Sequence, residues 1–150
     1  MKTLKVQNYR EMSLAGALII HEAVMEKLSR GEPFNLGLAT DVAGGATTSM
    51  FAAIRSAIQV SKLRYRLFDT DTEALTFPEA FFLATKGGGA FFGNAGSFEK
   101  GCPFDALILD DMAVPTVRDD LTVVERAERF IYLGDERYIT GKYAGGVRII

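Results

Sequence analysis

The sequence predicts an α/β fold, because apolar residues at helical spacing alternate along the chain with short apolar runs that end in turns. Helical spacing is clearest over residues 14–28 and 50–63. A short run at residues 34–39 separates these segments, and a nearly continuous apolar run occupies residues 104–109. With 48% hydrophobic and 24% charged residues, the 150-residue chain has the composition of a globular domain.

The first half of the chain is predicted to form a helix, a strand, a loop and a second helix. Ser13 can cap the first helix, which ends at Gly31. Alternating leucines predict a strand over residues 34–39, and a glycine pair follows it as a turn. Thr47 or Thr48 can begin the second helix.

A third helix is predicted by a capping box. Thr76 and Glu79 have the spacing of such a pair, and Pro78 occupies the first turn. The helix reaches a glycine run at residues 87–89. We expect a break or a close backbone approach at that run.

Beyond Gly93 the sequence becomes richer in strand signals. The apolar run at residues 104–109 predicts a strand, and residues 121–133 predict a helix. Residues 137–150 alternate around a glycine pair in the manner of a β-hairpin.

Charge and cysteine content exclude several classes of protein. The formal net charge is −2, from 17 basic and 19 acidic residues spread along the chain, so a nucleic-acid partner is not expected. Cys102 is the single cysteine and cannot form an intrachain disulfide, which fits a reducing, cytoplasmic location. We expect neither a signal peptide nor a membrane span, because the run at residues 14–20 is interrupted by Gly16.

Several motifs lack residues that their chemistry requires. The glycine spacing of residues 96–101 resembles a phosphate loop, but Cys102 and Pro103 follow where Lys and Ser or Thr belong. Asp69 opens a sequence like a calcium loop, but Ala74 replaces the turn glycine. These segments are predicted to be ordinary turns and loops.

Asp41 is the candidate catalytic residue. It follows the predicted strand at residues 34–39, and barrel enzymes place catalytic side chains at that end of a strand. An aspartate after a strand is also a common turn or helix-capping residue, so position leaves both roles open. His21, the single histidine, lies in a predicted helix without a second histidine to share a metal, which favours a structural or surface role.

A resemblance to a known family covers most of the chain, about residues 13–150. Residues 36–45, with the sequence Leu-Gly-Leu-Ala-Thr-Asp-Val-Ala-Gly-Gly, are similar to the eighth-strand region of guanine deaminases. Later segments resemble the helix after the barrel, the return strand, the C-terminal helix and the closing hairpin of that family, at residues 75–88, 96–110, 130–137 and 143–147.

The resemblance implies a particular division of the chain. Residues 1–92 would form the last helix-strand-helix units of a TIM (β/α)8 amidohydrolase barrel, and residues 93–150 the C-terminal part of a composite β-sandwich domain. A complete barrel usually takes about 250 residues, so we expect a fragment or a truncated product.

The resemblance also implies a reaction, the hydrolysis of guanine to xanthine and ammonia at a zinc site. Asp41 would bind the zinc, take a proton from the zinc-bound water and pass it to the leaving amine. The family's histidine ligands, its glutamate and its purine-binding residues have no counterpart in this chain, so Asp41 alone is assigned to the site. The isolated chain is therefore expected to be inactive.

The sequence is also compatible with two other functions. Another deaminase or a chlorohydrolase of the same superfamily would share these features, and a non-catalytic remnant could serve as an interaction module. The expected partners are a purine substrate in the complete enzyme and either a second copy of the chain or an upstream portion. No nucleic acid and no membrane is expected.

Overall fold

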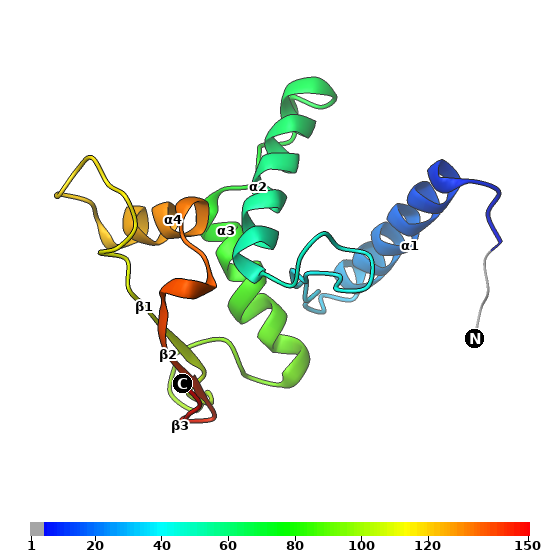
Figure 1. The fold of residues 1–150 in the computed structure, drawn as a ribbon. Helices are drawn as coiled ribbons and strands as arrows, with labels where there is room; N and C mark the ends of the chain where they lie inside the picture. Colours follow the sequence, from blue (N-terminus) through cyan, green and yellow to red (C-terminus); the bar gives the residue numbers. More distant parts are fainter. Residues whose placement is uncertain (1–4) are drawn as a thin grey trace. The chain divides into compact units, whose positions relative to one another are not determined.

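The structure is a computed structural model that describes residues 5–150, apart from the side chain of Tyr9. It contains two compact units, Met1–Phe34 and Asn35–Ile150, which are described separately below. Figure 1 shows the order of helices and strands along the chain. The mixed helix and sheet content that the sequence predicts is confirmed.

The first unit contains the helix α1 (Tyr9–Ser29). Its N-cap is Asn8, whose side chain accepts a hydrogen bond from the backbone N–H of Glu11 at 3.0 Å. The predicted cap at Ser13 is therefore wrong, because the Asn8 and Glu11 pair begins the helix one turn earlier. The predicted end is confirmed, since Gly31 adopts a left-handed φ of 67° just beyond the last turn.

Most described side chains of α1 are exposed, including many that are apolar. The exposed large apolar residues are Met12, Leu14, Leu18, Ile19, Ile20, Met25 and Leu28. Despite this apolar character, no helix within residues 5–150 combines the length and hydropathy needed to cross a bilayer.

The second unit begins its helical part with α2 (Met50–Leu67). Ser49 is the N-cap, and its hydroxyl accepts a hydrogen bond from Ala52 N at 3.3 Å. The predicted start at Thr47 or Thr48 is wrong by one or two residues, because the Thr47 hydroxyl instead accepts from Ser49 N at 3.0 Å and forms a turn. The helix ends at Leu67, with Phe68 as its C-cap.

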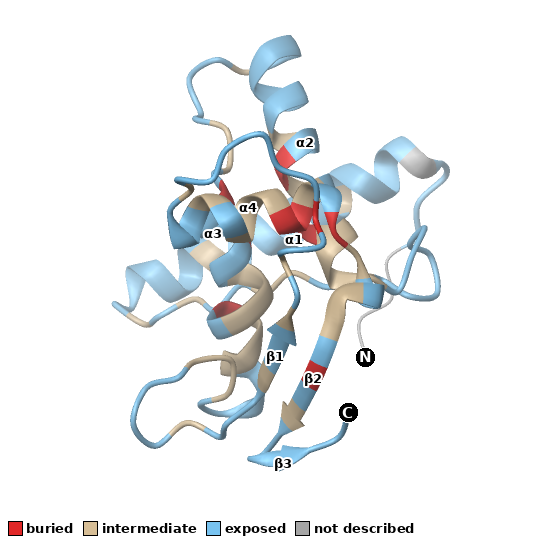
Figure 2. Ribbon diagram, turned by 60° about the vertical axis from the view of Figure 1, so that its left-hand side comes forward, coloured by how far each residue is buried: buried red, intermediate tan, exposed pale blue. Residues whose placement is uncertain are grey.

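The core of the second unit lies where α2 meets two shorter helices, α3 (Phe77–Phe82) and α4 (Val123–Leu133). Figure 2 shows the buried residues of these helices gathered at one place. The core residues are Ile54, Ile58, Phe77, Ala80 and Ile131. Both shorter helices begin with a capping box, and the one at Thr76 and Glu79 confirms the sequence prediction.

Polar and aromatic contacts also join α2 to α4. Arg55 Nη1 donates to the carbonyl oxygens of Ile131 at 3.1 Å and Tyr132 at 3.0 Å, in the last turn of α4. These carbonyls have no partner within the helix, and a cation near them is favourable. The ring of Phe51 meets Phe130 edge to face at 5.3 Å. The first half of α2 is thereby fixed to the end of α4.

Three antiparallel strands form a small sheet in the order β1-β2-β3. These are β1 (Ala106–Leu109), β2 (Ile139–Ala144) and β3 (Val147–Arg148). The turn between β2 and β3 contains Gly145 and Gly146, with φ values of 56° and 82°, which confirms the predicted hairpin. The predicted strand at residues 104–109 and helix at residues 121–133 are also confirmed within a few residues at their ends.

Residues 34–39 form no strand, so the strand predicted there is wrong for this chain. Instead, the Leu38 N–H donates to the Leu83 carbonyl at 2.9 Å, in a helical region. A parallel strand requires neighbouring strands for its ladder, and none of the strands described in residues 5–150 runs beside this segment. Of the two alternating leucines, Leu38 packs against the helical core, whereas Leu36 is exposed.

An ion-pair cluster joins the end of β1 to α4. Asp111 accepts hydrogen bonds from Arg126 Nε at 2.8 Å and from Arg129 Nη2 at 2.9 Å. The Asp111 side chain is only 15% exposed. The hydrogen bond from Arg126 is the main cause that lowers the pKa of Asp111 below its ordinary value.

We predict that Asp111→Asn lowers the free energy of unfolding by about 1–3 kcal/mol at pH 7, because charge-assisted hydrogen bonds are lost. A lowered pKa in the folded state means that the stabilisation is complete at neutral pH and declines as the pH falls below about 4. Urea unfolding at pH 7 and pH 3 should therefore show a smaller difference between wild type and variant in acid.

Asp120→Asn is the matched control for this prediction. Asp120 pairs with Arg118, but its side chain is 77% exposed, so the loss should stay below about 1 kcal/mol. An Asp111→Asn effect of equal size at both pH values would contradict the prediction.

Candidate functional site

Asp41 lies in the loop between residues 34–39 and α2. Its φ is +50°, and among the described residues no other non-glycine has a positive φ. Aspartate tolerates this left-handed conformation better than most residues. The Asp41 carbonyl accepts hydrogen bonds from Gly44 N at 2.8 Å and from Gly45 N, so the chain turns back on itself directly after Asp41.

Two glycines make this turn possible. A Cβ atom at Gly45 would lie 2.0 Å from the carbonyl oxygen of Thr40, so no side chain fits at this position. A Cβ atom at Gly44 would lie 3.0 Å from Asp41 Oδ2, which places the Asp41 carboxylate over the backbone of Gly44. The Asp41 side chain is exposed.

An exposed carboxylate in this position can accept a proton or bind a cation. Catalytic zinc normally has three protein ligands. Within residues 5–150, no group of three or more histidine, cysteine, aspartate or glutamate side chains could hold a metal ion. The residues of this chain therefore do not by themselves fit a zinc site, and Asp41 could provide one ligand of a larger set.

The other candidate groups lie apart from any such arrangement. His21 is exposed on α1, in the first unit, and Cys102 is a half-buried free thiol in the second. The Asp69 carboxylate accepts from Thr72 Oγ1 at 2.9 Å and pairs with Arg64 at 2.5 Å. The hydrogen bond from Thr72 is the main cause that lowers the pKa of Asp69. Asp69 thus stabilises the loop after α2.

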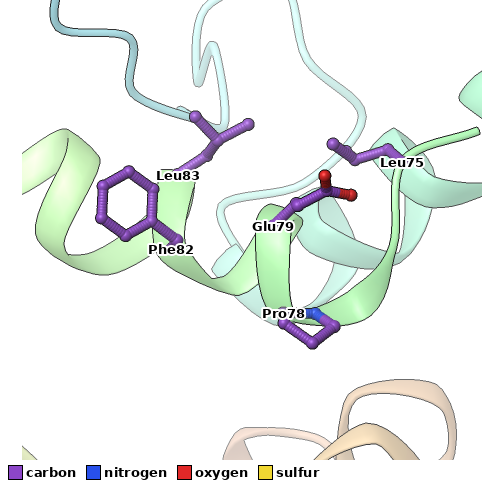
Figure 3. A pocket seen from close by; sticks show the side chains of 5 residues that line it. All are labelled: Leu75, Pro78, Glu79, Phe82 and Leu83. Carbon is purple, nitrogen blue, oxygen red and sulfur yellow. The ribbon is translucent and has the colours of Figure 1, made fainter. Parts of the chain in front are cut away.

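Two grooves lie beside α3, and Asp41 lines neither of them. The larger has a volume of about 420 Å³ and is mostly apolar. Figure 3 shows its lining side chains, which are Leu75, Pro78, Glu79, Phe82 and Leu83. Glu79 brings the one charged group, but its carboxylate accepts from Thr76 N at 2.8 Å as part of the capping box.

The glycine run at residues 87–89 makes the close backbone approach that the sequence predicted. A Cβ atom at Gly87 would lie 2.7 Å from the carbonyl oxygen of Leu36. Sequence reasoning did not connect this run with Asp41, although Leu36 precedes Asp41 by only a few residues. In the sequence, the glycine run indicates that another part of the backbone comes close, but it does not indicate which segment that is.

Curated proteins similar to this chain are guanine deaminases. The chain is 38% identical over 125 residues to the guanine deaminase of Rattus norvegicus and 36% identical over 126 residues to that of Homo sapiens. It is 29% identical over 119 residues to the guanine deaminase of Escherichia coli. These alignments cover 74–77% of this chain but only 25–27% of each relative, so the chain spans about a quarter of their length.

Solved structures that resemble this chain are also guanine deaminases. The crystal structure of guanine deaminase from C. acetobutylicum, with guanine bound in its active site, matches with a TM-score of 0.72 and 42% sequence identity. The match covers 85% of this chain and 29% of that one. The amidohydrolase family model matches residues 21–148. This chain therefore belongs to the amidohydrolase family.

Proposed function

We propose that this chain is the C-terminal portion of a zinc-dependent guanine deaminase, which hydrolyses guanine to xanthine and ammonia. The observation that carries the proposal is the 42% identity, with a TM-score of 0.72, to a guanine deaminase whose structure contains guanine. Because the chain spans 29% of that protein, the activity belongs to a longer polypeptide or to an assembly with an upstream portion.

In this proposal Asp41 is both a metal ligand and the proton acceptor. Its carboxylate is exposed, so substrate and water can reach it. The left-handed turn at Asp41, closed by hydrogen bonds from Gly44 and Gly45, supports a fixed backbone behind the carboxylate. Asp41 would accept a proton from the attacking water and deliver it to the leaving amine.

The proposed domain division follows from the family resemblance. Residues 1–92 would contribute the last helix-strand-helix units of a (β/α)8 barrel, and residues 93–150 part of a small β-sandwich. All three described strands lie in the second segment, which supports this division. Residues 34–39 would become the eighth barrel strand when neighbouring strands are supplied. We also propose that the complete enzyme is cytoplasmic and takes part in purine breakdown. This chain would associate with an upstream portion or with a second copy of itself.

We predict that the isolated chain binds no stoichiometric zinc and does not deaminate guanine, because one carboxylate cannot replace the three protein ligands that catalytic zinc normally has. Elemental analysis after dialysis against a weak chelator, together with a guanine deamination assay, tests this. One retained zinc per chain would show that a complete site exists within these residues. Zinc and activity that appear only with an upstream polypeptide would support the proposal.

We predict that Asp41→Asn lowers turnover of the complete enzyme by at least about 10²-fold, the loss typical of removing a general base. The fold should be retained, because the Asp41 side chain is exposed. Asp119→Asn is a matched control, since Asp119 is also an exposed loop aspartate. Wild-type turnover in Asp41→Asn would show that Asp41 is a turn residue without a catalytic role.

We predict that the isolated chain self-associates, because β1 is an edge strand of the described sheet with apolar side chains on both faces. Leu107 is 45% and Ile108 49% exposed. Size-exclusion chromatography with light scattering should give a mass above the 16.4 kDa of one chain.

A charge at this edge should reduce self-association. Leu107→Lys places a lysine on β1, whereas the control Val124→Lys changes an exposed residue of α4. We expect a smaller mass than that of the wild type in Leu107→Lys and an unchanged mass in Val124→Lys. A wild-type monomer with a sharp, cooperative melt would contradict the prediction.

A further inference from the structure

The segment that leads to Asp41 is attached to a π-helical turn far along the chain. This turn, η1 (Leu83–Gly87), directly follows α3. The Leu83 carbonyl accepts the N–H of Gly88, closing the wide turn, and also accepts the N–H of Leu38 at 2.9 Å. π-helical turns recur at functional sites. Through one carbonyl oxygen, this turn contacts the chain three residues before Asp41.

The two backbones approach so closely that glycine is required on each side. A Cβ atom at Gly37 would lie 2.8 Å from Gly88 Cα, and one at Gly87 would lie 2.7 Å from the Leu36 carbonyl oxygen. Either atom would force the backbones apart. A Cβ atom at Gly88 would meet only Leu83 O, at 3.3 Å. The close packing thus requires glycine at positions 37 and 87 far more than at position 88.

A second close contact lies on the other side of Asp41. The backbone of Gly45 packs against Thr40 O so tightly that a Cβ atom would lie 2.0 Å from it. The short stretch from Leu38 to Asp41 is therefore held between the π-helical turn on one side and the glycine turn on the other. Few freely rotating residues separate the first contact from Asp41. A displacement of the backbone at that contact would therefore also move the Asp41 carboxylate.

We infer that Gly87 is a positioning residue for Asp41, because its missing side chain lets the π-helical turn hold residues 36–38 and so sets where the carboxylate lies. The inference rests on the proposed catalytic role of Asp41. Displacing a reacting group by about 1 Å can cost on the order of 10²-fold in rate, so a backbone shift caused by one methyl group is sufficient to be measured.

The kinetic test uses the complete enzyme that contains this segment. Gly87→Ala should lower kcat about 10²-fold while KM for guanine stays within about threefold, because the displaced group acts in the chemical step. Gly16→Ala is the control, because a Cβ atom at Gly16 on α1 meets nothing within 4 Å, and it should keep wild-type kcat. Gly37→Ala should reproduce Gly87→Ala, because it opens the same contact from the opposite side.

A second measurement does not depend on activity and uses the 150-residue chain. Nuclear magnetic resonance should show a changed ¹³Cγ chemical shift of Asp41 and faster exchange of the Leu38 amide in Gly87→Ala and Gly37→Ala. Both signals should keep their wild-type values in Gly16→Ala. Circular dichroism reports whether each variant keeps its helices.

The outcomes separate this inference from the proposed function. Unchanged kcat and Asp41 shift in Gly87→Ala, with Asp41→Asn inactive, would overturn the positioning role and leave the proposed function standing. A shifted Asp41 signal together with an active Asp41→Asn enzyme would support the structural coupling and overturn the proposed function. Loss of helix in both Gly87→Ala and Gly37→Ala would overturn the inference, because the contact would then serve folding instead of Asp41.

Discussion

The burial of Ile54 and Ile58 against α3 and α4 is the interaction on which the second unit depends. These two side chains fix the first half of α2, and the hydrogen bonds from Arg55 to the end of α4 hold the same stretch in place. Because α2 begins directly after the Asp41 loop, the core also anchors that loop at its downstream end. Beyond Ser61 the helix has little packing, and its last residues are exposed.

In the proposed function, the chemistry of the chain depends on one exposed carboxylate, that of Asp41, and the rest of the structure would support that group indirectly. In the larger groove beside α3 the one charged group, Glu79, belongs to a capping box, and the ion pairs of Asp69 and Asp111 stabilise loops. This distribution matches a chain that spans only about a quarter of its relatives' length. A scaffold of this kind can hold a catalytic group in place without containing the residues that recognise a substrate.

The sequence predicted what depends on neighbouring residues and missed what depends on distant ones. The capping box at Thr76 and the hairpin at residues 137–150 are local patterns, and both were confirmed. The helix starts were wrong where several polar residues compete, since Asn8 caps in place of Ser13. The strand at residues 34–39 was wrong because a strand needs partners that a local pattern cannot supply. Asp41 remains a predicted site residue, from its position and the family resemblance, and its left-handed backbone was not predicted.

The Asp111 cluster has a consequence for how this chain can be rearranged. Asp111 joins the end of β1 to α4, so the residues between them form a loop whose two ends are held together. Val114 is buried at the base of this loop, whereas residues 115–120 are all exposed. Exposed loop tips with fixed ends are the places where proteins accept insertions, protease cuts and new termini. A tag or a new chain end placed within residues 115–120 would leave the sheet and the helical core connected through Asp111.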